Sequence, residues 1–166
     1  MTTVIFSHGQ ESGPWGSKIC AMAELVRSMG CMADSIDYQG IADPAERVAK
    51  LTKECADIDD MLILVGSSMG GHVATAAAGQ LDAAGLFVLA PAYYMPGYED
   101  LTPNPPGMPT CIVHGWNDDI VPVENSIRFA RTCNAELHLL DSGHRLTEEI
   151  DDINYHLRRF IEKIVS

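Results

Sequence analysis

A serine set among glycines is the clearest chemical signal in the sequence. Gly66-Ser67-Ser68-Met69-Gly70-Gly71 follows an apolar run at residues 61–65 and precedes an alanine-rich stretch at 73–80. This is a G-x-S-x-G pattern in a strand–turn–helix context, where glycines permit a turn tight enough to raise the serine hydroxyl above the sheet edge. Backbone amides at the start of the following helix would favour a developing oxyanion there. The pattern predicts nucleophilic catalysis by Ser68.

Two other functions of glycine-rich loops fit these residues poorly. A Walker A loop continues from its last glycine with Lys and then Ser or Thr, whereas Gly71 is followed by His72 and Val73. A dinucleotide-binding G-x-G-x-x-G loop would need a glycine at the position of Ser68. A glycine-rich turn without any catalytic role stays open as the alternative.

A serine hydroxyl needs a base, and two later apolar runs end in suitable residues. Asp118 and Asp119 follow the run at residues 110–114, and His144 follows the run at 136–140. In a parallel sheet the loops after the strands lie at one edge, where ligands bind. The order Ser, Asp, His along the chain therefore predicts a catalytic triad, with either Asp118 or Asp119 as its acid.

The elements that must position these residues alternate along the chain. Apolar runs that predict strands lie at residues 3–6, 32–36, 61–65, 86–90, 110–114 and 136–140. Helical patterns fall at residues 19–29, 44–55, 73–80 and 147–164, the last with Thr147 as its cap. Because several strands are apolar at nearly every position, we expect helices on both faces. The prediction is α/β: a three-layer α/β/α sandwich with a mostly parallel sheet of about six strands, in one domain spanning residues 1–166.

A long irregular stretch separates two of the predicted strands. Residues 91–109 hold six prolines together with Tyr93, Tyr94 and Tyr98. Loops of this length in compact domains are usually binding loops or lids, although an excursion without function stays open. Tyr93 and Tyr94, with Trp15 and Trp116, could form an aromatic substrate wall, and ordinary packing explains each of them about as well.

Taken together, these motifs resemble the α/β-hydrolase superfamily over essentially the whole chain. The matching segments are Ser7-His8-Gly9-Gln10, the turn at 66–70, His114-Gly115-x-x-Asp118-x-x-Val121-Pro122, and Gly143-His144. The chain is most similar to compact esterases that lack a cap domain, with the first antiparallel strands of larger members missing.

The resemblance implies a role for individual residues. Ser68 would be the nucleophile, His144 the base and Asp118 the acid, since the family spacing selects Asp118 and leaves Asp119 as a solvated charge. The backbone amides of Gln10 and Met69 would form the oxyanion hole. No metal or organic cofactor is implied.

The remaining histidines are expected to be structural. His8 and His114 each precede a glycine at a strand end, so we expect them to be packed and hydrogen-bonded near the site without taking part in catalysis. His72 lies just inside the helix after Ser68. His138 and Asp141 could suggest a metal site with His144, but strand and loop positions would aim these side chains differently.

The composition of the chain indicates which kinds of binding partner and cellular compartment to expect. With 23 acidic and 11 basic residues the formal net charge is −12, so nucleic acid and anionic membrane surfaces are poor partners. Five widely spaced cysteines, with no CxxC, suggest neither disulfides nor zinc, in keeping with a reducing compartment. With no signal peptide or membrane span recognised, we expect a cytoplasmic location. Oligomeric state stays open.

The sequence thus predicts a serine hydrolase that cleaves a small carboxylic ester or thioester through an acyl-enzyme. Two alternatives stay open. One is an acyltransferase or a cofactor-free haloperoxidase on the same triad. The other is a ligand-binding protein with negligible turnover.

Overall fold

Six strands form one sheet in the order β2-β1-β3-β4-β5-β6. The computed structural model describes residues 1–96 and 102–166, so Tyr98 lies outside the described residues. Every strand pairing within the described residues is parallel. The strands are β1 (Thr2–Ser7), β2 (Met32–Ile36), β3 (Met61–Ser67), β4 (Gly85–Leu89), β5 (Thr110–Gly115) and β6 (Glu136–Leu140).

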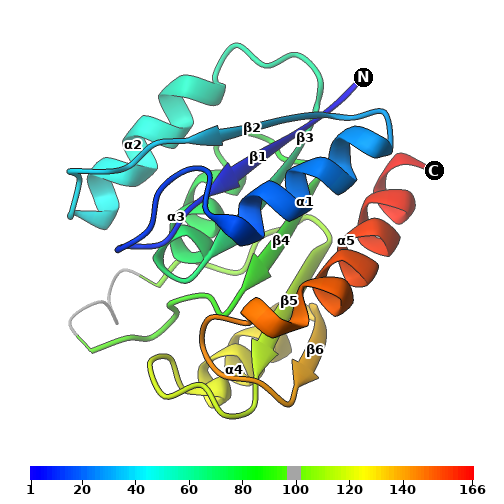
Figure 1. Ribbon diagram of the computed structural model, residues 1–166. Helices are drawn as coiled ribbons and strands as arrows, with labels where there is room; N and C mark the ends of the chain where they lie inside the picture. The colour runs from blue at the N-terminus through cyan, green and yellow to red at the C-terminus, as the bar shows by residue number, and fades with distance from the viewer. Residues whose placement is uncertain (97–101) are drawn as a thin grey trace.

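Helices cover both faces of this sheet (Figure 1). The helices are α1 (Ser17–Ser28), α2 (Pro44–Cys55), α3 (Met69–Ala78), α4 (Val123–Cys133) and α5 (Ile150–Val165), with a short 3₁₀ turn, η2 (Thr147–Glu149), before α5. Helices α1 and α5 bury their apolar faces in one core cluster, while α2, α3 and α4 contribute to a second cluster on the opposite face. The predicted three-layer α/β/α architecture is confirmed.

The burial of each strand follows from its place in the sheet. All residues of β4 and β5 are buried, because these inner strands have a neighbour on each side and helices on each face. The edge strand β2 alternates between exposed and half-buried residues before Ile36, and the edge strand β6 is half-buried throughout. The continuous apolar runs of the sequence therefore mark the inner strands.

The predicted helices differ from the observed ones in three places. Helix α3 begins directly after Ser68, earlier than the alanine-rich stretch indicated. Thr147 begins the 3₁₀ turn, and α5 starts at Ile150, with no side-chain cap at Glu149. Helix α4 was not predicted, and its N-cap residue, Pro122, also makes no side-chain cap hydrogen bond.

Two features of the fold bear on the site. The parallel topology brings the loops after β1, β3, β5 and β6 to the same edge of the sheet. Between β4 and β5 the described residues, 90–96 and 102–109, include no helix. Within the described residues, no helix is both long enough and apolar enough to cross a membrane.

Candidate active site

The turn between β3 and α3 holds Ser68 in an uncommon backbone conformation. Ser68 has φ 55° and ψ −120°, a backbone conformation that residues other than glycine rarely adopt. Two glycines allow this turn. A Cβ on Gly66 would collide with the backbone of Gly70, and a Cβ on Gly70 would collide with the carbonyl oxygens of Ser7 and His8. The tight packing of α3 against the end of β1 therefore fixes where the Ser68 hydroxyl lies.

The side chains of Ser68, His144 and Asp118 form a hydrogen-bonded series. Ser68 Oγ lies 3.0 Å from His144 Nε2, and His144 Nδ1 lies 2.7 Å from Asp118 Oδ2. Since an ionised carboxylate only accepts, Nδ1–H of His144 donates to Asp118, which leaves Nε2 free to accept the Ser68 proton. Asp119, the other candidate acid, is exposed to solvent.

Asp118 is held by donors on both of its oxygens. Its side chain is fully buried. Oδ1 accepts the backbone N–H groups of Ile120 and Val121, each at 2.8 Å. Besides His144, Nε2 of His114 lies 3.0 Å from Oδ2. The sequence predicted that His114 would be packed near the site, but not that it contacts the acid itself.

The loops that carry the acid and the base pack directly on each other. The backbone N–H of Trp116 donates to the carbonyl of Leu140 at 2.8 Å, and that of Asn117 to Ser142 at 3.0 Å. A Cβ on Gly115 would collide with the carbonyl oxygen of Ser142. This close approach sets the distance between the Asp118 and His144 side chains.

The loop after β1 lies beside Ser68, where the sequence placed the oxyanion hole. A Cβ built on Gly9 would lie 3.6 Å from Cβ of Ser68. Gln10 follows Gly9 and lines the same cavity as Ser68 and Met69. Met69 is the first residue of α3, so its N–H has no acceptor within the helix. Both predicted amide donors therefore belong to residues that border the nucleophile.

A cavity of about 130 Å³ lies next to Ser68. Apolar residues make up most of its wall, with His72 among the few polar ones. The lining residues are Gln10, Pro44, Ser68, Met69, His72, Ala92, Met95, Pro96, Ile120 and Val121. His72 is buried and its Nδ1 atom has no hydrogen-bond partner within the described residues. Burial lowers the pKa of His72 below its ordinary value, so the ring is neutral at pH 7.

Neither Tyr93 nor Tyr94, which the sequence offered as part of an aromatic wall, lines this cavity. Tyr93 is completely buried: its ring stacks on Phe129 at 4.0 Å between centroids and its hydroxyl lies 2.5 Å from Thr75 Oγ1. Tyr94 lies under the guanidinium of Arg128, 3.9 Å from its ring centroid. Both tyrosines belong to the packing between the β4–β5 loop and α4.

The two tryptophans also lie outside the cavity. Trp15 is 43% exposed, with the guanidinium of Arg27 5.5 Å from its ring centroid. Trp116 is 55% exposed on the acid loop. Small or flexible apolar residues, such as Met95 and Ile120, form the apolar part of the cavity wall.

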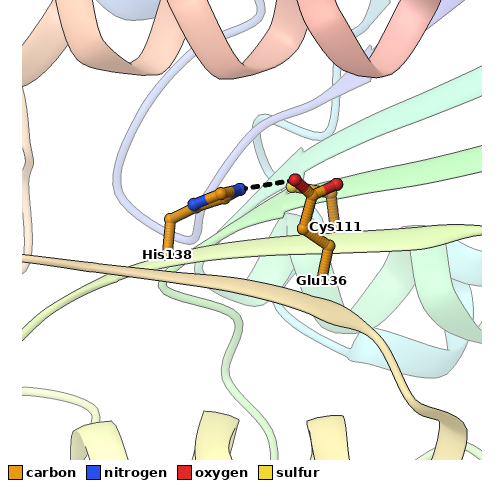
Figure 2. A group of neighbouring side chains, drawn as sticks. All are labelled: Cys111, Glu136 and His138. Carbon is orange, nitrogen blue, oxygen red and sulfur yellow. Dashed lines mark hydrogen bonds and ion pairs between the residues drawn. The ribbon is translucent and has the colours of Figure 1, made fainter. Parts of the chain in front are cut away.

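One cluster of metal-ligating residues lies apart from Ser68, at the β5–β6 edge of the sheet (Figure 2). Ligand atoms of Cys111, Glu136 and His138 lie within 4.8 Å of one another. Glu136 already has two partners: His138 Nε2 lies 2.9 Å from its Oε1 atom, and the ammonium of Lys163 lies 3.5 Å from its Oε2 atom. Burial raises the pKa of the Cys111 thiol, which keeps it protonated. The cluster is therefore a polar patch beneath α5 in which the Glu136 carboxylate is paired with neighbouring side chains.

Comparison with solved structures agrees with this architecture. The chain is similar to a candidate hydrolase of the α/β superfamily from Xanthomonas campestris, with 27% identity, a TM-score of 0.88, and coverage of 97% of this chain and 98% of that one. It is also similar in fold to Est1E from Butyrivibrio proteoclasticus with ferulic acid bound, at 16% identity and a TM-score of 0.86, covering 99% and 90%. Mouse α/β hydrolase domain-containing protein 10 gives 22% identity and a TM-score of 0.79, covering 98% and 90%.

The fold and these likenesses make the chain a compact hydrolase of the α/β superfamily. More narrowly, it belongs to UPF0227, an uncharacterised protein family whose model matches residues 3–104. No functionally curated protein matches the sequence.

Proposed function

We propose that the protein is a serine hydrolase that cleaves small carboxylic esters or thioesters through an acyl-enzyme on Ser68. The observation that carries the proposal is the hydrogen-bonded series from Ser68 Oγ through His144 to Asp118, with 3.0 Å and 2.7 Å steps. A serine bonded to an imidazole that is itself oriented by a buried carboxylate is the arrangement that activates a hydroxyl.

In the first half of the reaction Ser68 Oγ attacks the substrate carbonyl carbon while Nε2 of His144 takes the hydroxyl proton. The carbonyl oxygen becomes an oxyanion, which the backbone N–H groups of Gln10 and Met69 stabilise. Collapse of this intermediate breaks the bond to the alcohol or thiol, and His144 returns the proton to that leaving group. The acyl group stays on Ser68.

In the second half water attacks the acyl-enzyme, and His144 removes the proton from that water. A second oxyanion forms and collapses, which releases the carboxylic acid and returns the proton to Ser68. Asp118 stays ionised and stabilises the imidazolium that forms twice in each cycle. The small apolar cavity beside Ser68 suits a short acyl group.

The test is labelling with a fluorophosphonate, located by mass spectrometry, followed by turnover of p-nitrophenyl esters and acyl thioesters. We expect the label on Ser68. The Ser68→Ala variant should lose at least roughly 10³-fold in kcat with an unchanged thermal transition. Ser67→Ala is the matched control, because the neighbouring hydroxyl is left out of the series, and it should keep its activity.

Other outcomes would point elsewhere. A label on Ser67, or normal turnover by Ser68→Ala, would overturn the assignment. Preferential transfer of the acyl group to an added alcohol would indicate an acyltransferase. Tight ligand binding without labelling or turnover would indicate a binding protein.

A further inference from the structure

Arg47 on α2 is a buried cation that has no counter-ion among residues 1–96 and 102–166. Only 2% of the residue is exposed, and no carboxylate of the described residues lies within 4.0 Å of its guanidinium. Taking such a charge out of water is costly unless strong acceptors replace the water. An arginine in these surroundings therefore needs a specific set of hydrogen-bond acceptors.

Those acceptors are backbone carbonyl groups, and three of the four belong to the loop beside Ser68. Nη1 of Arg47 donates to the carbonyls of His8 at 3.4 Å and Gly9 at 3.1 Å, and Nη2 donates to that of Gln10 at 3.3 Å. Nε donates to the carbonyl of Ile41 at 2.7 Å. The planar fork of the guanidinium thus holds three successive peptide groups and the Ile41 carbonyl at once, four acceptors in all, whereas an ammonium has only three donors.

The Gly9 carbonyl has a second donor. Nδ1 of His8 lies 2.8 Å from this oxygen, and Nε2 of His8 accepts the backbone N–H of Tyr38, also at 2.8 Å. Because Nε2 accepts, the proton of the neutral ring sits on Nδ1 and points at the Gly9 oxygen. Two side chains from different parts of the fold therefore converge on one carbonyl.

That carbonyl and the N–H of Gln10 belong to the same peptide group. A peptide is planar, so fixing the direction of its C=O fixes the direction of its N–H on the opposite side. Donors on the oxygen also polarise the group and strengthen its N–H as a donor. We propose that Arg47, with His8, positions the Gly9–Gln10 peptide so that its N–H serves as the oxyanion donor.

This inference rests on the proposed function and deepens it. Arg47 acts through the peptide, so it is a positioning residue and not a catalytic one. Its contribution should appear where charge develops on the carbonyl oxygen, in kcat, and little in ground-state binding. A residue that only stabilised the fold would change the amount of active enzyme and not its preference between substrates.

The experiment compares wild type with Arg47→Met and Arg47→Lys, with Arg27→Met as the matched control. Arg27 also donates to a backbone carbonyl, that of Ala33 at 3.3 Å, but on the far end of α1. Active enzyme is first counted by fluorophosphonate titration. Turnover is then measured on p-nitrophenyl butyrate and on its thionoester, in which sulfur, a larger and weaker acceptor, replaces the carbonyl oxygen.

We expect kcat for the oxygen ester to fall about 10- to 100-fold in both Arg47 variants, with KM within about threefold of wild type. The sulfur of the thionoester accepts only weakly from the amides of the oxyanion hole, so kcat for this substrate should fall much less. The ratio of kcat for the oxygen ester to kcat for the thionoester should therefore decrease. Arg27→Met should match wild type in both. Arg47→Lys keeps a buried cation, so it carries the test if Arg47→Met does not fold.

An unchanged oxygen-to-sulfur preference in the Arg47 variants, or a kcat within twofold of wild type, would overturn the inference. Failure of the proposed function is a separate result, since it would appear in the wild-type protein as the absence of labelling and of ester turnover.

Discussion

His114 and His144 both face the same oxygen of Asp118. The distance from Oδ2 is 3.0 Å to Nε2 of His114 and 2.7 Å to Nδ1 of His144. His114 Nε2 also faces the carbonyl of Val121 at 2.9 Å, so it must carry the proton, and Nδ1 accepts from the Ser126 hydroxyl at 2.6 Å. Burial lowers the pKa of His114, which keeps this ring neutral and its tautomer fixed. The orientation of the carboxylate therefore depends on a residue outside the proposed triad.

Replacing His114 tests this dependence. In His114→Leu the Asp118 oxygen loses its polar neighbour at 3.0 Å, while His144 and the two backbone N–H groups remain, so we expect kcat to fall on the order of tenfold. Ser126→Ala, which removes only the partner that fixes the tautomer, should lower kcat less. Turnover of p-nitrophenyl acetate per titrated site measures both. A His114→Leu enzyme as fast as wild type would show that His144 alone orients the carboxylate.

The two adjacent aspartates should differ sharply. Asp118→Asn should lower kcat by about 10²–10⁴. The amide oxygen would keep the two backbone N–H groups at the Oδ1 position, so the NH₂ group would face His144, and a neutral amide cannot stabilise the imidazolium. Asp119→Asn should cost less than about tenfold, since that side chain is solvent-exposed. Steady-state kinetics on both variants at one pH decides the matter. Equal losses would mean that the acid is assigned to the wrong residue.

Much of the site could be predicted because its signals are local. The turn around Ser68 is a six-residue pattern with a steric cause, and the rule that loops of a parallel sheet share one edge brings Asp118 and His144 to it. Their placement side by side follows from topology, while their roles stay predictions.

Other features depend on contacts between distant segments and could not be predicted. Tyr93 was offered as a pocket residue because it lies in the long proline-rich stretch, yet its ring is buried and stacks on Phe129. The contacts of Arg47 with residues 8–10 join segments almost 40 positions apart, and nothing in the spacing of either segment announces them. Helix α4 was not predicted because its buried face includes Ser126, a polar residue that interrupts the apolar pattern.

The glycine after Met69 should be irreplaceable. A Cβ in Gly70→Ala would collide with the backbone oxygens of Ser7 and His8, which cannot move without displacing β1. We expect a loss of several kcal/mol in the free energy of unfolding, as for other severe overpacking. Gly79→Ala is the control: nothing lies within 4 Å of its added Cβ, so it should be neutral or stabilising by up to about 1 kcal/mol. Urea unfolding of both variants measures the difference.

The buried ring of His72 should make stability depend on pH. Its pKa is lowered in the folded protein from 6.5, so its contribution is intact above pH 6.5 and is lost as pH falls below that value. Each such proton costs up to about 1.4 kcal/mol per pH unit. In His72→Leu this cost is absent, so the variant should gain stability relative to wild type between pH 7.5 and 5. Parallel stability profiles for the two proteins, measured by urea unfolding, would contradict the prediction.

The cavity beside Ser68 should limit the acyl chain. Each buried methylene is worth about 0.8 kcal/mol, so preference grows with chain length only while the wall can still cover the chain. With a cavity of about 130 Å³, we expect kcat/KM to peak for acyl groups of roughly two to six carbons. A series of p-nitrophenyl esters from acetate to palmitate measures this. A maximum at the long end would reveal a binding tunnel.

The residues assigned to chemistry follow four different strands, and this has a consequence for folding. These residues lie after β1 (Gln10), β3 (Ser68), β5 (Asp118) and β6 (His144). The sheet must therefore be complete from β1 to the edge strand β6 before the four residues meet. Parallel strands joined by long crossovers pair late, since each pairing closes a large loop of chain. No fragment ending before β6 could hold the whole set. The chemistry of Ser68 would then report on the finished fold as a unit, appearing in a refolding protein only when the last strand has joined the sheet.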